Sequence, residues 1–186
     1  MEAVKKIELN KIVKIILIAG IGTLLLTISA KIKIPFYPVP MTMQTFVVLF
    51  LGITLGSKIG LLTVSLYLLE GIYGLPVFAG TPEKGIGFIY FTGPTMGYLL
   101  GFLVAVYFAG SFKYEKGLVN SLIKLIFSVS FIYIIGMAWL GLLIGWEKPI
   151  FKLGAQPFLL AELFKILLLL FLVPNLLRLK KFLKII

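Results

Sequence analysis

The segment PFLLAELFKILLLLFLV (157–173) is long enough and apolar enough to cross a membrane, yet it contains Glu162 and Lys165. A charged side chain at membrane depth costs about 2.5 to 3.5 kcal/mol on insertion scales. Residues three positions apart share one face of a helix, so this carboxylate and this ammonium can point into one pocket. The pair predicts a binding site that offers a polar solute an acceptor and a donor together. The alternatives are a salt bridge that only neutralises itself and a lysine whose ammonium extends to the membrane surface.

The composition of the whole chain is that of a membrane protein. Of its 186 residues, 60% are hydrophobic, whereas soluble domains contain about 45 to 50% apolar residues. The mean hydropathy is +1.11, and only 13% of the residues are charged, most of them between the apolar segments. The sequence therefore predicts a single integral-membrane, substrate-binding domain over residues 1–186, surrounded by the lipid bilayer.

Apolar segments alternate with polar loops in a way that predicts an all-α protein with six transmembrane helices. The six segments are residues 11–32, 41–56, 58–74, 94–112, 118–145 and 155–173. Basic residues are concentrated on the side that would hold both termini, which places both termini in the cytoplasm. Pro174 is expected to end or kink the last span, with residues 175–186 as a basic amphipathic tail on the cytoplasmic face of the bilayer.

Two predicted outer loops are rich in proline. The segment IPFYPVP (34–40) contains three prolines and cannot be helical, so the second span should begin near Met41. The longer loop GLPVFAGTPEKGIGFIYFTGP (74–94) carries Phe78 and three other aromatic residues. A long loop of this composition predicts a lid over the helices. The alternative is a surface connector with aromatic side chains at the membrane interface.

Several functions are excluded by residues that the sequence lacks. The chain has no Cys, His or Asp, which excludes Cys or His metal sites and a Ser-His-Asp triad, so we expect no metal, no cofactor and no enzymatic activity. Residues 52–58 read GITLGSK, which lacks the spacing of an ATP-binding loop. The net charge of +11 comes from lysines that flank apolar spans, which indicates membrane topology rather than nucleic-acid binding. Uphill transport would need energy from a partner or an ion gradient.

Two further polar residues are candidates for a site at the outer end of the helices. Gln44 should lie one turn inside the second span, where its amide can both donate to and accept from a ligand. Glu70 should lie one turn before the outer end of the third span. Both would converge with Glu162 and Lys165 if the bundle closes there.

Small residues recur in the first span at Ala19, Gly22 and Thr23. In lipid, small residues one turn apart allow another helix to approach closely. The pattern predicts a lipid-accessible interface with a partner protein. The alternative is packing within the six-helix bundle.

Four motifs follow one another along the chain and precede the E-x-x-K pattern at 162–165. They are VPMTMQTF (39–46), GIYGLPVFAG (71–80), TGPTMGYLLGF (92–102) and GMAWLG (136–141). In this order, and over nearly the whole chain, they resemble the BioY family, the biotin-binding S components of energy-coupling factor (ECF) transporters. The resemblance implies a six-helix ECF S component in the cell membrane of a prokaryote. It would bind biotin from outside and deliver it inward with a T-component membrane protein and two ATPases.

The resemblance also implies roles for single residues. In the family a carboxylate and a lysine on the last helix help to hold biotin, and these positions match Glu162 and Lys165, although the carboxylate is usually Asp. The ureido ring of biotin has two N–H donors and one carbonyl, which suit this pair. Its thiophane ring and valerate chain would suit Phe78, Tyr98 and Trp139.

Two positions depart from the pattern of the family. The first-helix A-x-x-x-A surface that contacts the T component matches Ala19 and Thr23 only in part. Some members carry an Arg near the biotin carboxylate where this chain has Leu99, which leaves Lys84, another cation or solvent for that group.

Two other functions compete with biotin binding. The chain would resemble an S component equally if its substrate were another vitamin, such as thiamine or riboflavin. A small proton-coupled exporter, in which Glu162 alternates between a proton and a cation, is a third interpretation. Lys165 argues against it, because a nearby positive charge favours the ionised carboxylate.

Overall fold

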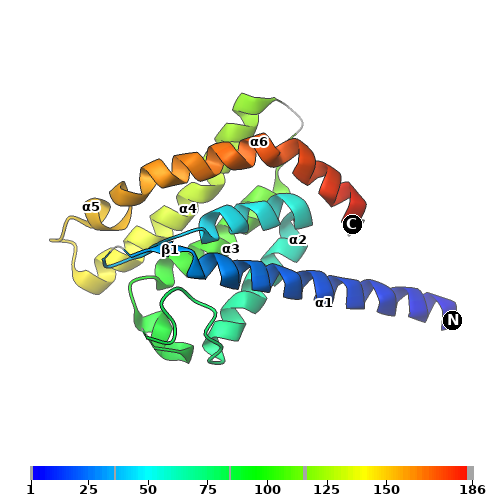
Figure 1. Ribbon diagram of the computed structural model, residues 1–186, viewed down its shortest axis with the longest axis horizontal. Helices are drawn as coiled ribbons and strands as arrows, with labels where there is room; N and C mark the ends of the chain where they lie inside the picture. Colours follow the sequence, from blue (N-terminus) through cyan, green and yellow to red (C-terminus); the bar gives the residue numbers. More distant parts are fainter. Residues whose placement is uncertain (1, 36, 84, 115–116, 184–186) are drawn as a thin grey trace.

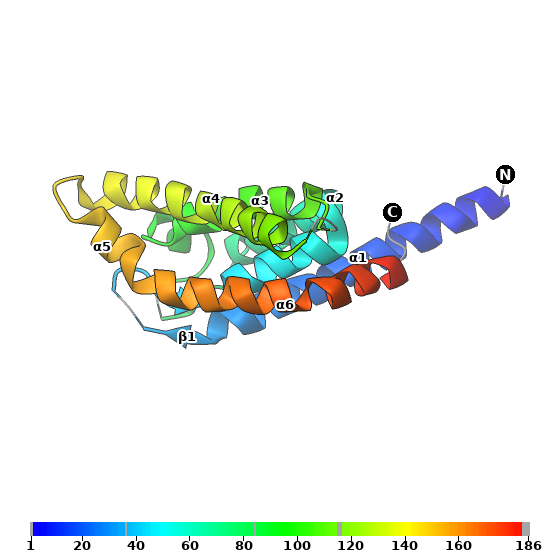
Figure 2. The same cartoon turned by 90° about the horizontal axis from the view of Figure 1, so that it is seen from above.

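The computed structural model describes residues 2–35, 37–83, 85–114 and 117–183. Long helices lie along the longest axis of the molecule (Figures 1 and 2). In chain order the elements are α1 (Glu2–Lys31), β1 (Lys33–Ile34), β2 (Met41–Thr42), α2 (Gln44–Ile72), the 3-10 helix η1 (Gly87–Thr92), α3 (Met96–Ser111), α4 (Leu118–Ile144), α5 (Ile150–Gly154), the 3-10 helix η2 (Gln156–Phe158) and α6 (Leu159–Leu183). Both views place the two termini toward one end of the molecule, with β1 and α5 at the other end.

The second helix contains a sharp bend at Gly56. This residue has φ +76° and ψ 174°, a backbone conformation that residues other than glycine rarely adopt. The bend separates residues 44–55 from residues 57–72, which point in different directions in Figure 1. The sequence predicted two spans here, 41–56 and 58–74, and the structure divides the helix at the same place.

In the described part of the chain, four helical segments are long and apolar enough to cross a membrane. They are Lys11–Lys31, Gln44–Ile72, Leu118–Ile144 and Ile150–Leu183, and the shorter helix α3 is also apolar. The predicted all-α membrane architecture is therefore confirmed in its coarse form. One difference is the short hairpin in which Lys33 pairs with Thr42 and Ile34 with Met41.

One predicted boundary differs from the structure by three residues. The second helix begins at Gln44 rather than near Met41, because Met41 is paired in the hairpin, and Gln44 is consequently its first residue rather than one turn inside. The expectation that Pro174 ends or kinks the last span is met by a bend, because α6 continues to Leu183. Proline removes one backbone donor without preventing continuation, and the C-terminal part of α6 bends away from its first part in Figures 1 and 2.

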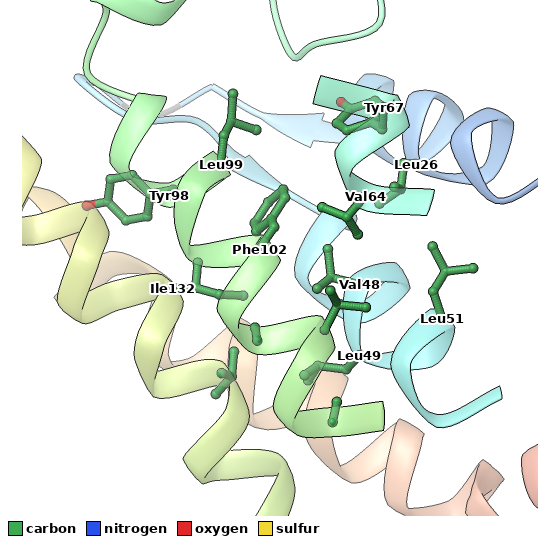
Figure 3. Close-up of a cluster of buried hydrophobic side chains, with 14 of the residues drawn as sticks. Leu26, Val48, Leu49, Leu51, Val64, Tyr67, Tyr98, Leu99, Phe102 and Ile132 are labelled. Carbon is green, nitrogen blue, oxygen red and sulfur yellow. The ribbon is translucent and has the colours of Figure 1, made fainter. Parts of the chain in front are cut away.

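A buried apolar cluster joins α2, α3 and α4 and holds the site in place. Figure 3 shows Leu49 and Val64 of α2 beside Phe102 of α3 and Ile132 of α4. All four side chains are buried. Because these helices contribute rigid apolar faces, the polar residues at their ends are positioned by packing rather than by loops.

The small residues of α1 lie inside this packing. Ala19 and Thr23 are 2% and 3% exposed, and Gly22 is also buried. A Cβ atom built on Gly22 would overlap the Cγ2 atom of Thr63 on α2. The prediction of a lipid-accessible small face at these residues is therefore wrong for the subunit as it stands. Close approach of α1 to α2 uses that face.

Candidate functional site

A small cavity lies where the hairpin, α2, α3, α4 and α6 meet. Its volume is about 60 Å³. Its polar lining comes mainly from Thr42, Gln44, Thr45, Tyr133 and Lys165. Its apolar lining includes Tyr98, Leu99, Phe102, Ile132 and Phe158. An apolar cavity with a few convergent polar groups is the usual form of a small-molecule site.

Glu162 and Lys165 are buried together on one face of α6, as the sequence predicted from their spacing, and Lys165 lines the cavity. Glu162 is 3% exposed and Lys165 is 7% exposed. The Lys165 Nζ atom lies 3.3 Å from Glu162 Oε2. Both residues belong to the first two turns of α6, which brings them to the end of the molecule that holds the hairpin.

All three donors of the Lys165 ammonium have an acceptor. Besides Glu162 Oε2, Nζ donates to Thr42 O at 2.8 Å and to Thr45 Oγ1 at 3.0 Å. An ammonium has three N–H groups, so this set satisfies it completely. The interpretation that Lys165 extends to the membrane surface is therefore wrong.

The Glu162 carboxylate is satisfied at one oxygen only. Its Oε2 atom accepts from Thr45 Oγ1 and from Tyr133 Oη, each at 2.9 Å, and from Lys165. Its Oε1 atom is buried and has no hydrogen-bond partner, and no other buried side-chain polar atom in the described part of the chain shares that condition. Leaving a buried acceptor unpaired costs about 1 to 3 kcal/mol, more when it is charged. Such an oxygen can still accept a hydrogen bond from a donor that is not part of the chain.

Gln44 connects the cavity to the loop after α2. Its Nε2 atom donates to Tyr67 Oη at 2.8 Å, and its Oε1 atom lies 3.2 Å from Thr42 Oγ1. Tyr67 in turn donates to Val77 O at 3.0 Å. Gln44 thus lines the cavity as predicted, with its amide held in a fixed orientation.

Tyr98 forms one apolar wall of the cavity. Its ring points toward α4 in Figure 3, and Gly136 of that helix lies directly beneath it, because a Cβ atom there would overlap the ring. The hydroxyl donates to Gly154 O at 2.8 Å. Glycine at position 136 is therefore required for the ring to lie flat against α4.

Four predicted site residues do not line the cavity. One of them is Glu162, whose carboxylate is bound by Thr45, Tyr133 and Lys165, and these three residues do line it. Phe78 is 1% exposed and stacks on Tyr90 with ring centres 4.8 Å apart. The indole nitrogen of Trp139 donates to Gly93 O at 2.9 Å, which anchors the chain just before α3. Glu70 is half-buried near the end of α2, away from the cavity lining. Phe78 supports the wall from behind, because Tyr90 lines the cavity.

The predicted lid over residues 74–94 is a partly buried loop. Phe78, Tyr90 and Phe91 pack together in the interior, whereas Phe88 is 71% exposed. Burial raises the pKa of Tyr90, so its hydroxyl stays protonated and donates to Ala79 O at 2.7 Å. Leu99 lines the cavity, and Lys84 lies outside the described residues.

Two residues of the site were not predicted from the sequence. Thr45 and Tyr133 both donate to Glu162, and Thr45 also accepts from Lys165. Hydroxyl groups are common in apolar helices because they can bond to the helix itself. Only contact across helices distinguishes these two, although Thr45 lies beside Gln44 in a motif that was already noted.

A metal site is not supported by the described part of the chain. It contains no group of three or more His, Cys, Asp or Glu side chains close enough to hold an ion. The carboxylate at the cavity instead faces an ammonium and two hydroxyls. This set suits a neutral ligand with N–H or O–H donors.

Several known proteins are similar to this chain in sequence, and one solved structure is similar in fold. A family model described as the BioY family matches residues 3–182. A probable biotin transporter BioY of Pyrococcus horikoshii is 36% identical over 141 residues, which cover 76% of this chain and 82% of that protein. The biotin transporter BioY of Thermotoga maritima is 36% identical over 149 residues, covering 80% of this chain and 86% of that protein.

A solved structure has the same arrangement of helices. The crystal structure of the S component for biotin from an ECF-type ABC transporter matches with a TM-score of 0.75 and 26% sequence identity. The match covers 91% of this chain and 93% of that one. These relatives are named as transporters, in agreement with the expectation that this chain is not an enzyme.

Proposed function

This chain belongs to the BioY family, and on that premise we propose that it is the biotin-binding S component of an ECF transporter. It binds biotin from outside the cell and delivers it inward together with an ATP-driven module. The main observation behind the proposed position of biotin is the buried Oε1 atom of Glu162, which has no hydrogen-bond partner. Biotin is the transported substrate rather than a cofactor.

The chemistry of biotin fits the groups at the cavity. The ureido ring presents N–H donors, and Glu162 Oε1 is an acceptor without a partner. Oε2 is held by three donors, which fix the plane of the carboxylate. The apolar remainder of biotin would lie against Tyr98 and Phe102. Binding therefore replaces an unpaired acceptor by a charge-assisted hydrogen bond, which is among the stronger kinds.

The size of the cavity requires the walls to move when biotin binds. A volume of about 60 Å³ is far below the range of roughly 300 to 1,000 Å³ that is usual for ligand pockets. A second, apolar cavity of about 390 Å³ lies on the other side of Met41, Thr42 and Lys165. Because movement of the walls precedes tight binding, association should be slower than for a rigid pocket.

The membrane arrangement and the partners form the wider part of the proposal. The six crossings would be α1, the two segments of α2 on either side of Gly56, α3, α4 and α6. In this arrangement both termini lie in the cytoplasm and the cavity lies near the outer surface. A T component and two ATPases would supply the energy. Docking at Ala19, Gly22 and Thr23 would first require α1 to separate from α2, whereas Leu24 and Ile28 already face outward.

Calorimetry of the purified chain with biotin, in detergent and without ATP, tests this function. We expect binding with one site per chain and a higher melting temperature at saturating biotin. A parallel titration with thiamine and riboflavin should give no heat. Binding of another vitamin instead of biotin would contradict the substrate, and binding only after ATPases are added would contradict an independent binding subunit.

An analogue tests the role of Glu162 Oε1 directly. Biotin that is alkylated at one ureido nitrogen loses one donor and keeps its apolar part. We expect its affinity to fall by about 10-fold or more, since a buried acceptor is left unpaired. Equal affinity for biotin and for analogues blocked at either nitrogen would show that Oε1 does not accept from the ureido ring.

A further inference from the structure

Lys31, the last residue of α1, holds a loop that is distant in the sequence. Its Nζ atom lies 2.8 Å from Pro76 O, 3.0 Å from Phe78 O and 3.2 Å from Thr81 O. It also lies 3.1 Å from Thr81 Oγ1. An ammonium has three donors, and here all of them are directed at one short segment, residues 76–81.

Side chains from two other elements hold the same segment. Tyr67 of α2 donates to Val77 O at 3.0 Å, and Tyr90 of η1 donates to Ala79 O at 2.7 Å. The carbonyl groups of four successive residues, 76 to 79, are thus each bound by a side chain. Buried backbone carbonyls outside helices and strands need such donors. Phe78 O also accepts from Thr81 Oγ1, within the segment, at 2.7 Å. Three side chains from other elements therefore hold the segment, and of these only Lys31, which is exposed, comes from α1.

The segment forms part of the cavity wall. Ala79 and Tyr90 both line the cavity, and Gln44 reaches the segment through Tyr67. Phe78 stacks behind Tyr90. Because these contacts are continuous, displacement of residues 76–81 would also displace Ala79 and Tyr90. It would disturb Tyr67 as well, the hydrogen-bond partner of Gln44.

We propose that Lys31 is a positioning residue for the ligand site, which fixes residues 76–81 and so keeps the Ala79 and Tyr90 wall closed over a bound ligand. The identity of the ligand as biotin rests on the function proposed above. Lys31 does not line the cavity, so it acts through the loop. Loss of its donors should loosen the wall and raise the rate at which the ligand leaves, with less effect on the rate at which it enters.

The charge of Lys31 offers a competing explanation, because a cation at a helix C-terminus interacts favourably with the helix dipole. Lys33 provides the matched control. It carries the same charge two residues further along, in β1, and takes no part in the bonds to residues 76–81. Replacement of each lysine by methionine keeps the aliphatic stem and removes the charge and the donors.

Two measurements on the purified full chain test the proposal. A chase of pre-bound labelled biotin should show dissociation roughly tenfold faster from Lys31→Met, as expected when charge-assisted bonds to carbonyl groups are lost. Lys33→Met should dissociate as the unmodified chain does, and Lys31→Arg should restore most of the slow dissociation because it supplies donors again. In the ligand-free chain, hydrogen–deuterium exchange over residues 76–81 should be faster in Lys31→Met and unchanged in Lys33→Met.

The outcomes separate this proposal from the proposed function. If the unmodified chain fails to bind biotin, the function is wrong, and the exchange experiment alone decides the role of Lys31. Unchanged exchange over residues 76–81 in Lys31→Met overturns the proposal in every case. Faster exchange throughout the chain, with a lower melting temperature, would overturn it too, because Lys31 would then serve the fold as a whole. Equal dissociation from Lys31→Met and Lys33→Met would show that the loop does not retain the ligand.

Discussion

Two regions of the molecule were candidates for binding when only the sequence was considered, and they differ in what surrounds them. The polar cluster consists of Thr45, Tyr133, Glu162 and Lys165, and the small-residue face consists of Ala19, Gly22 and Thr23. Both are buried. The polar cluster retains one unpaired acceptor beside a cavity, whereas the small-residue face is filled by α2.

The difference follows from what each kind of residue costs to bury. Burial of a charge is costly, so a charged pair at membrane depth needs a specific compensation. Small residues need none, because they suit any close helix contact, inside a subunit or between subunits. Charge in an apolar span is therefore the more specific sign of a binding site.

The largest expected effect comes from Glu162→Ala. It removes the proposed acceptor for the ligand and leaves the buried Lys165 without its counter-charge, a change that typically costs about 3 to 5 kcal/mol. We expect biotin affinity to fall by at least about 100-fold and the melting temperature to fall as well. Calorimetry and thermal melts measure both, with the exposed Glu147 as the control in Glu147→Ala. If folded Glu162→Ala bound biotin with unchanged affinity, the Glu162–Lys165 pair would have only a structural role. The polar cluster and the small-residue face would then not differ in function.

A somewhat smaller loss is expected for Lys165→Met. The methionine keeps the volume of the side chain but removes its bonds to Thr42 O and Thr45. Glu162 then loses one of its three donors and its neighbouring positive charge. We expect affinity for biotin to fall by roughly 30-fold, equivalent to about 2 kcal/mol. Retention of full affinity would restrict the ligand contact to Glu162.

The small-residue face should respond in stability rather than in affinity. Ala19→Trp places a large side chain where α1 meets α2 and should lower the free energy of unfolding by about 1 to 3 kcal/mol. The folded fraction should bind biotin with unchanged affinity, since Ala19 is remote from the cavity lining. Leu24→Trp, on the exposed side of α1, is the matched control and should leave the melting temperature unchanged. A normal melting curve for Ala19→Trp would show that α1 separates readily from α2, as the sequence interpretation of a partner interface requires.

The smallest effect is expected for Tyr133→Phe. The ring stays in place, and only the hydroxyl that donates to Glu162 Oε2 is lost. Two donors remain on that oxygen, so affinity for biotin should fall by about three- to tenfold. Isothermal titration of the variant measures this, and a loss as large as that of Glu162→Ala would place Tyr133 in direct contact with the ligand.

Much of the molecule follows from the sequence because membrane burial leaves a strong local signal. Apolar runs of sufficient length marked the helices, and the glycine at position 56 divided α2 close to where two spans were predicted. The positions of Glu162 and Lys165 within one run placed them on one face of α6. These are properties of spacing, and spacing does not depend on which helices become neighbours.

Contacts between distant segments were decided by the tertiary structure. Thr45 meets Glu162 across 117 positions of the chain, and Lys31 meets residue Thr81 across 50. Trp139 was expected at the site because its ring would suit the apolar part of biotin, and Glu70 because of its position near the outer end of a span. Packing directed Trp139 to Gly93 and left Glu70 outside the cavity lining. The sequence alone determined that a buried charge pair must be compensated, since that follows from the cost of placing charge in lipid. Which oxygen remained open, and which helix covered the small residues, depended on the three-dimensional fit of side chains, which no local pattern records.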